Sequence, residues 1–203
     1  METVNIVERP EEVSYQAIQD LLHRAHESNK AKNLIYATAD QTVDKLRQKI
    51  ETDHGVCFVA MMGKKLVGTA TVSFRKLHYW YHNGNVAIIK LVGVDPDYKG
   101  QHISSQLVER CLALARERGE SVVVSDSAEQ NIQIRHLYLN HGFLITDYGL
   151  YAANNFYTTI YVNWLDECPY SDFYRNLRYQ MKRCWIRLLY KPGKVNRFSG
   201  KKG

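Results

Sequence analysis

The chain has 203 residues, of which 45% are hydrophobic and 24% are charged, and this composition fits one globular domain with a short appendage. It contains no collagen-like or solenoid repeat and no run of eighteen apolar residues, which argues against a fibrous protein and against a membrane-spanning helix. A soluble cytoplasmic protein is therefore the default expectation, since the N-terminus also lacks a basic start followed by an apolar run.

The charge is unevenly distributed. Residues 170–203 contain ten Lys or Arg residues and one Asp, a net charge of +9, whereas the rest of the chain carries −3. The overall charge of +6 therefore describes neither part. A polyanionic partner would belong to the C-terminal segment, and the basic pI gives no reason to expect nucleic-acid binding by the domain.

The N-terminal part predicts a strand followed by two helices. Residues 3–8 alternate apolar and polar side chains, which is typical of a strand. Apolar stripes over residues 13–25 and 43–50 predict two amphipathic helices, the second with Thr42 as its N-cap. Residues 28–39 between them fit either a helix or a loop.

The remainder predicts strands and helices that alternate. Gly63-Lys64-Lys65 joins the strands over 56–62 and 66–74 as a hairpin, and Gly119 ends the helix over 103–118. We expect strands over residues 56–62, 66–74, 86–94, 121–125, 144–150 and 156–164, and helices over 103–118 and 131–140.

The predicted order is β-α-α-β-β-β-α-β-α-β-β. Because a helical crossover joins the fourth and fifth strands, these two should be parallel and the connection right-handed. The fold class is therefore α+β, with a mixed, mostly antiparallel sheet flanked by helices.

The four cysteines, Cys57, Cys111, Cys168 and Cys184, form no CxxC pair. We therefore expect neither a zinc site nor a disulfide framework, and predict buried free thiols and no bound metal.

The loop after the fourth strand has the features of a phosphate cradle. The amides of a helix N-terminus are unpaired and carry partial positive charge, so they bind phosphate groups. Gly100 permits close approach, Lys99 adds a cation, and the hydroxyls of Ser104 and Ser105 can cap the helix or donate to a ligand. Taken alone, these residues also fit an ordinary helix start.

A second segment supports the cradle. The stretch from Asn131 to Phe143 follows the pattern Asn-x-x-Ala-x-x-Leu-Tyr-x-x-x-Gly-Phe, with Ile134 in place of Ala. Together with the loop, it resembles the GNAT superfamily of acyl-CoA-dependent N-acyltransferases, over about residues 1–164 in element order. The loop departs from the family's Arg/Gln-x-x-Gly-x-Gly/Ala pattern at Lys99, His102 and Ser104. A histidine lacks the freedom of glycine, so we expect a loop geometry that a side chain tolerates.

The resemblance implies a mechanism and a donor. Acetyl-CoA would be the co-substrate, and a neutral amine of a small molecule or protein would attack its thioester directly. Tyr138 would protonate the departing thiolate, although its helical spacing also fits a core aromatic residue. The parted fourth and fifth strands would hold the pantetheine arm. The implied coenzyme A-binding residues are Val92, Gly93, Val94, Lys99, Gly100, Gln101, His102, Ile103, Ser104, Ser105, Asn131 and Tyr138.

The general base and the acceptor site stay open. Lys90 stands on the fourth strand where many relatives carry an acid. A water chain is one alternative, and the aromatic run 77–82 either borders an acceptor pocket or packs as a hairpin on the first helices. The candidate bases are Asp126, Glu129, His78 and His82.

The C-terminal segment predicts an amphipathic helix. Its apolar face comprises Phe173, Leu177, Met181, Cys184, Trp185 and Leu188, and basic side chains occupy the rest. Docking on the domain or dimerisation is the commonest outcome for such a helix, and an anionic membrane or RNA is an alternative partner. We predict an acyltransferase domain over residues 1–168, this helix over 169–190, and a disordered tail over 191–203. A non-catalytic relative that binds coenzyme A, or nucleic acid through its tail, is the alternative function.

Overall fold

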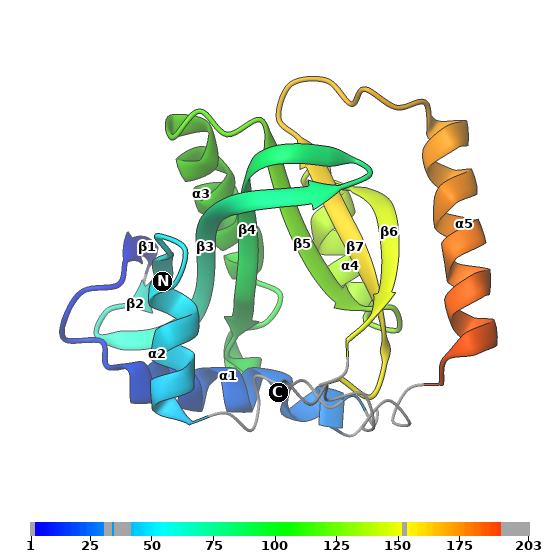
Figure 1. The fold of residues 1–203 in the computed structure, drawn as a ribbon. Helices are drawn as coiled ribbons and strands as arrows, with labels where there is room; N and C mark the ends of the chain where they lie inside the picture. The colour runs from blue at the N-terminus through cyan, green and yellow to red at the C-terminus, as the bar shows by residue number, and fades with distance from the viewer. Residues whose placement is uncertain (1–2, 31–33, 35–41, 152–153, 192–203) are drawn as a thin grey trace, which may run out of the picture.

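The computed structural model describes residues 3–30, 34, 42–151 and 154–191 (Figure 1). Seven strands form one sheet in the order β1-β2-β3-β4-β5-β7-β6. The strands are β1 (Val4–Glu8), β2 (Val56–Met62), β3 (Lys65–Tyr79), β4 (His82–Val94), β5 (Val122–Ala128), β6 (Leu144–Leu150) and β7 (Tyr157–Trp164). The helices are α1 (Tyr15–Lys30), α2 (Val43–Glu51), α3 (Ile103–Glu117), α4 (Ile132–Asn140) and α5 (Asp172–Leu189). The predicted fold class and element order are confirmed.

Helices cover both faces of the first half of the sheet. Successive side chains of a strand point to opposite faces. On β2, Phe58 and Ala60 accordingly belong to the core beneath α3, whereas Cys57 and Val59 belong to the core beneath α1 and α2. This two-sided burial explains why β2 is a continuous apolar run rather than an alternating one.

The β3–β4 hairpin covers one face of the second half of the sheet. Leu77 and Tyr81 are buried against residues of β5 and β7. The Trp80 ring contacts the Tyr170 ring at 5.3 Å, and the Tyr170 hydroxyl donates to the Trp80 carbonyl. The aromatic run 77–82 therefore packs on the sheet and on the segment before α5, and the alternative that it packs on the first helices is wrong. This role also explains why both strands extend beyond their predicted ends.

Strands β4 and β5 are parallel, as predicted, but they pair only over a short length. The registered pairs are Ala87 with Val123 and Ile88 with Val124. At the next position the Ser125 hydroxyl donates to the Ile89 carbonyl over 3.0 Å. A side-chain hydrogen bond thus takes the place of a backbone hydrogen bond between the strands where they part. A bulge follows on β4, where Leu91 has φ of 56°. Beyond it, no residue of β5 pairs with β4 in the described part of the chain.

The cysteine prediction holds only in part. Cys57 and Cys111 are buried free thiols, whereas Cys168 is half-buried and Cys184 is exposed on α5. Cys184 is exposed because α5 turns the face that carries it away from the domain. Among the described residues, no group of His, Cys, Asp and Glu side chains has the arrangement of a metal site, and no helix is long and apolar enough to cross a membrane.

Two predicted segments fall partly outside the described residues. Helix α1 continues through Lys30, so residues 28–30 of the ambiguous 28–39 segment are helical, and most of the remainder is not described. The predicted disordered tail lies outside the description except for Lys191. The predicted C-terminal helix is present as α5, which lies beside β6 (Figure 1).

Candidate functional site

A buried carboxylate anchors the loop between β4 and α3. Asp95 is only 4% exposed, and its side chain accepts from the Asp97 amide at 3.1 Å and from the Arg24 guanidinium at 3.1 to 3.2 Å. Pro96 then begins a short 3₁₀ turn that extends to Tyr98. Because charge-assisted hydrogen bonds are strong, this arrangement fixes the direction in which the loop leaves the sheet.

The loop enters α3 through left-handed backbone. Gly100 has φ of 80°, and His102, the N-cap residue of α3, has φ of 56° and ψ of 18°. Histidine is one of the side chains that visits this region most readily, although at a cost. The loop therefore takes a geometry that a side chain tolerates, as expected, but one that glycine adopts at lower cost.

The N-terminus of α3 presents unpaired amides. The first intrahelical hydrogen bond runs from the Gln106 amide to the His102 carbonyl, so the amides of Ile103, Ser104 and Ser105 have no acceptor within the helix. The His102 side chain makes no capping hydrogen bond to the described helix. These donors and the helix dipole make this end of α3 suited to an anion.

The left-handed backbone leads to a prediction about stability. Replacing His102 with Gly should raise the free energy of unfolding by about 1 kcal/mol, because the αL penalty of a side chain is relieved. Urea unfolding measures this change. Ser104→Gly is the matched control: Ser104 lies in the first turn of α3, and the same replacement there should lower stability. A His102→Gly protein less stable than the original would contradict the assigned loop geometry.

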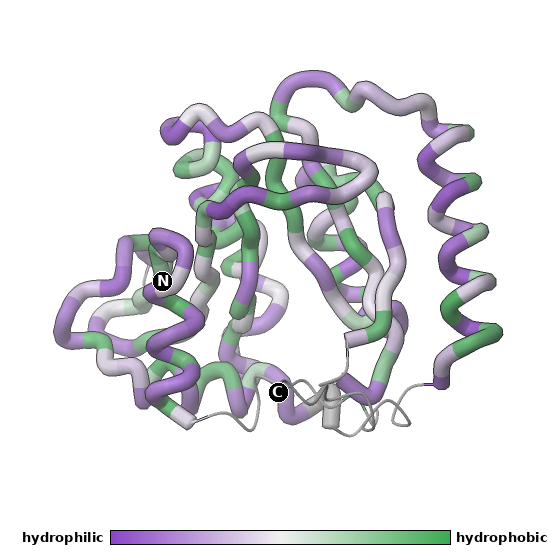
Figure 2. Tube along the Cα trace, viewed as in Figure 1, coloured by the Kyte–Doolittle hydropathy of each residue, from purple (hydrophilic) through white to green (hydrophobic). Residues whose placement is uncertain are grey.

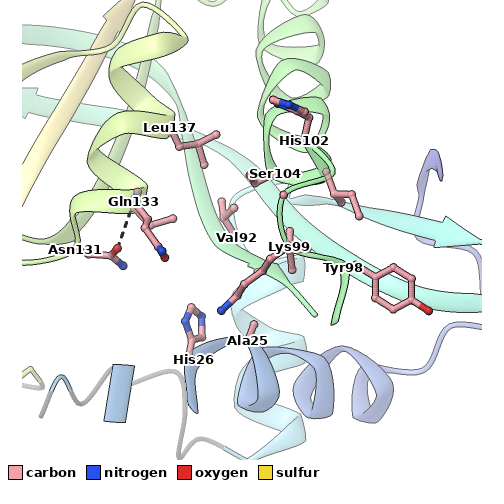
Figure 3. A pocket seen from close by; sticks show the side chains of 15 residues that line it. Ala25, His26, Val92, Tyr98, Lys99, His102, Ser104, Asn131, Gln133 and Leu137 are labelled. Atoms are coloured by element: carbon pink, nitrogen blue, oxygen red, sulfur yellow. Dashed lines mark hydrogen bonds between the residues drawn. The ribbon is translucent and has the colours of Figure 1, made fainter. Parts of the chain in front are cut away.

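A cavity of about 260 Å³ lies between this loop, α1, α4 and the end of β4 (Figure 3). Most of the predicted coenzyme A-binding residues line it, whereas Gln101, Ser105 and Tyr138 do not. Ile103 also packs into the core beneath α3. The predicted residues in its wall are Val92, Gly93, Val94, Lys99, Gly100, His102, Ile103, Ser104 and Asn131.

Lys99 and His26 extend toward one another at the mouth of this cavity, while the His102 ring points away from them (Figure 3). Burial, with smaller effects from His23 and Lys99, lowers the pKa of His26 to about 4. His26 is therefore neutral at neutral pH, and Lys99 supplies the positive charge. His26 lies just beyond the apolar stripe that defined the first helix, so no sequence pattern marked it.

A second cavity of about 410 Å³ adjoins the first, and the two share His26, Val92, Asn131 and Ile134 in their walls. It follows the parting of β4 and β5. Polar and charged side chains reach it from several elements, among them Lys49, Lys90, Ser125, Asp126, Tyr138 and Tyr151. The two cavities together form one continuous cleft with an anion-binding end and a mixed-charge end.

Tyr138 lies where this cleft meets the core. It is 2% exposed, and its ring contacts Phe143 at 5.1 Å and Tyr161 at 5.2 Å. Burial raises the pKa of Tyr138, and a hydrogen bond with Ser125 opposes this effect. The hydroxyl is therefore protonated at neutral pH. The ring is a core aromatic, as its helical spacing indicated, and the residue also lines the second cavity.

Asp126 is the sequence-derived base candidate that lines the cleft. Its side chain is accessible from the cleft, yet the surrounding protein desolvates it and raises its pKa to about 6. Glu129 instead forms ion pairs with Arg183 and Arg187, and His78 hydrogen-bonds Asn83 in the β3–β4 hairpin. Neither these two nor His82 is among the described cavity-lining residues.

The second cavity also carries positive charge. Lys90 and Lys49 both line it, and burial lowers the pKa of each amine. Lys90 thus occupies the strand position where an acid was sought, while the carboxylate of the cleft comes from β5. The cleft thus receives its carboxylate from β5 and not from β4, which the spacing of residues along β4 alone cannot reveal.

Comparisons with known proteins agree with this geometry. The model of the Acetyltransferase (GNAT) family matches residues 15–143. An N-acetyltransferase from Staphylococcus aureus Mu50 is 22% identical over 81% of this chain and 99% of its own, with a TM-score of 0.63. The putative acetyltransferase yncA from Salmonella typhimurium, solved with its cofactor acetyl-CoA, is 20% identical over 83% and 98% of the two chains, with a TM-score of 0.61.

A GNAT family acetyltransferase from Elizabethkingia anophelis, with acetyl-CoA bound, is 15% identical over 81% of this chain and 99% of its own, with a TM-score of 0.57. No curated protein sequence gives a significant match. The parted parallel strands and the loop that opens α3 define an acyltransferase fold. This chain belongs to the GNAT acetyltransferase family.

Proposed function

We propose that this chain is an N-acetyltransferase that transfers the acetyl group of acetyl-CoA to a primary amine within a ternary complex. One observation carries the proposal: the anion-binding cavity and the mixed-charge cavity meet at the parting of β4 and β5, with Tyr138 beside the junction. Such an arrangement brings a donor and an acceptor together at one protonated hydroxyl.

The anion-binding end suits coenzyme A. The unpaired amides of α3 and the Lys99 ammonium would hold the pyrophosphate, and a Cβ added to Gly100 would contact nothing, so the backbone there is open to a ligand. The edge of β4 from Val92 to Val94 would hold the pantetheine arm. The bound acetyl-CoA of the Salmonella and Elizabethkingia structures supports this donor. Gln101 stays in the proposed set as a loop residue, and Ser105 stays in it through its unpaired amide in the first turn of α3.

The mixed-charge end suits an amine. Asp126 would accept a proton from the acceptor ammonium or from the attacking nitrogen, since its pKa of about 6 leaves it ionised at neutral pH yet basic. The amine lone pair would attack the thioester carbonyl, forming the C–N bond. Amide groups of β4 beyond Ile88 would stabilise the developing oxyanion. As the C–S bond breaks, Tyr138 would give its proton to the coenzyme A thiolate.

Ligand binding gives the first test. Acetyl-CoA and coenzyme A should raise the melting temperature of the full chain, with about 2.7 kcal/mol of stabilisation at a ligand concentration 100 times Kd. Lys99→Ala should weaken binding about tenfold through loss of a phosphate contact. Lys64→Ala, an exposed lysine in the β2–β3 turn that lies outside both cavities, is the matched control and should bind as the original does.

A screen for coenzyme A thiol release over a panel of primary amines then tests transfer. Absence of stabilisation by either ligand, together with salt-sensitive RNA binding, would overturn the proposed donor and favour nucleic-acid binding by the basic tail. Binding of coenzyme A without transfer to any amine would favour the non-catalytic alternative.

A further inference from the structure

The apolar face of α5 points away from the protein. Phe173 is 78% exposed, Trp185 67% and Leu188 84%. Figure 2 shows hydrophobic and hydrophilic residues alternating along the helix, which stands at one edge of the fold. We call these outward residues the α5 stripe: Phe173, Leu177, Met181, Cys184, Trp185, Leu188 and Leu189, all of them exposed.

The opposite face of α5 is fixed to the domain by ion pairs. Lys182 pairs with Asp147 at 2.8 Å, and the Asp147 side chain is 2% exposed. Arg183 and Arg187 pair with Glu129 at 2.8 and 2.6 Å, and the Tyr148 hydroxyl donates to the same carboxylate.

Rotation of α5 to bury its stripe would remove these partners from the two carboxylates. An uncompensated buried charge is strongly unfavourable, so the polar face stays inward and the stripe stays outward. Docking on the domain, one of the outcomes expected for this helix, therefore occurs through the side that carries these cations and Tyr179.

The positive charge beside the α5 stripe indicates what kind of partner the stripe binds. Three exposed cations lie at its margin: Arg178, which also lies over the Trp80 ring, Lys182, which pairs with Asp147, and Lys191. The single acid of the helix, Asp172, is paired with Arg175. In a twofold pair of α5 helices, these margins would bring like charges together, which disfavours a second copy of this chain. RNA would satisfy the cations but would leave the apolar side chains exposed to water.

An anionic lipid surface satisfies both features. Helices that lie in the membrane interface place Trp, Phe and Leu among the acyl chains and Lys and Arg at the headgroups. Basic residues at the margin are attracted to the negative surface potential of anionic lipids. We propose that α5, as a unit distinct from the catalytic domain over residues 1–168, attaches this protein to the surface of an anionic membrane through the α5 stripe.

Vesicle sedimentation of the full chain tests the proposal. The protein should co-sediment with vesicles of phosphatidylcholine and phosphatidylglycerol, and at least tenfold less with phosphatidylcholine alone. The double variant Trp185→Ser, Leu188→Ser should lose at least tenfold in partitioning. Ile132→Ser is the matched control, because Ile132 is also an exposed apolar residue, 63% accessible, but belongs to α4. It should bind vesicles as the original does.

The altered residues are exposed, so both variants should keep the original melting temperature, which separates loss of binding from loss of folding. Failure to bind anionic vesicles at low salt would overturn the proposal. So would equal binding by the double variant. A concentration-dependent dimer that the double variant abolishes, without vesicle binding, would assign the stripe to a second copy. These outcomes do not depend on acetyl transfer.

Discussion

Replacing Tyr138 with Phe should lower the rate of acetyl transfer by about 10²-fold or more while leaving acetyl-CoA affinity nearly unchanged. The change removes only the hydroxyl, and the ring contacts with Phe143 and Tyr161 are retained. A loss of 10²-fold corresponds to about 2.7 kcal/mol of transition-state stabilisation. Single-turnover kinetics should be used, because slow product release can mask the chemical step.

Tyr161→Phe provides the matched control. Tyr161 belongs to the same aromatic cluster and is 1% exposed, but it is not among the residues that line either cavity. Its variant should transfer the acetyl group at close to the original rate. If Tyr138→Phe retains the full single-turnover rate, Tyr138 is a core residue without a role as the acid. If both variants lose activity equally, the effect belongs to core packing.

Much of the fold could be predicted because its signals are local. Turn residues such as Gly119 and caps such as Thr42 and Asn131 end or begin elements at the predicted places. The parallel pairing of β4 and β5 followed from chain connectivity alone. The resemblance of the segment from Asn131 to Phe143 to the family pattern singled out Tyr138, and the spacing of Tyr138 from Ile134 placed both on one face of α4.

The features that could not be predicted depend on contacts between distant segments. Leu91 adopts φ of 56° at the bulge, although leucine has no preference for that region. Ser125 marks the strand parting only because Ile89 lies opposite it. The stripe of α5 was evident from its period, but a period does not say which face packs inward. Here Asp147 and Glu129 decide the orientation, and both come from elsewhere in the chain.

Asp126→Asn tests the mixed-charge end of the cleft. The variant should reduce kcat by about 10²-fold or more, since the amide cannot accept the proton that leaves the amine. In the original protein, activity should rise with pH through about 6 as the carboxyl ionises, and the variant should lack this step. Glu120→Gln is the matched control: desolvation raises the pKa of Glu120 as well, but this residue is not among those lining the cavities.

The same substitution should have an opposite effect on stability. The folded-state pKa of Asp126, about 6, lies above the ordinary value of 3.8 for an aspartate, so the folded protein binds the proton more tightly than the unfolded chain does. The free energy of unfolding therefore falls as pH rises from about 3.8 to about 6. Above pH 6 the folded protein carries the whole destabilisation caused by the desolvated, ionised carboxylate. Asp126→Asn removes that cost, so its melting temperature should exceed that of the original protein at pH 7 to 8 and match it near pH 4. Higher stability together with lower activity is the expected signature of a carboxylate kept for chemistry. A fully active variant would remove Asp126 from the base role. A variant less stable than the original at pH 8 would show that the carboxylate is held by a structural partner.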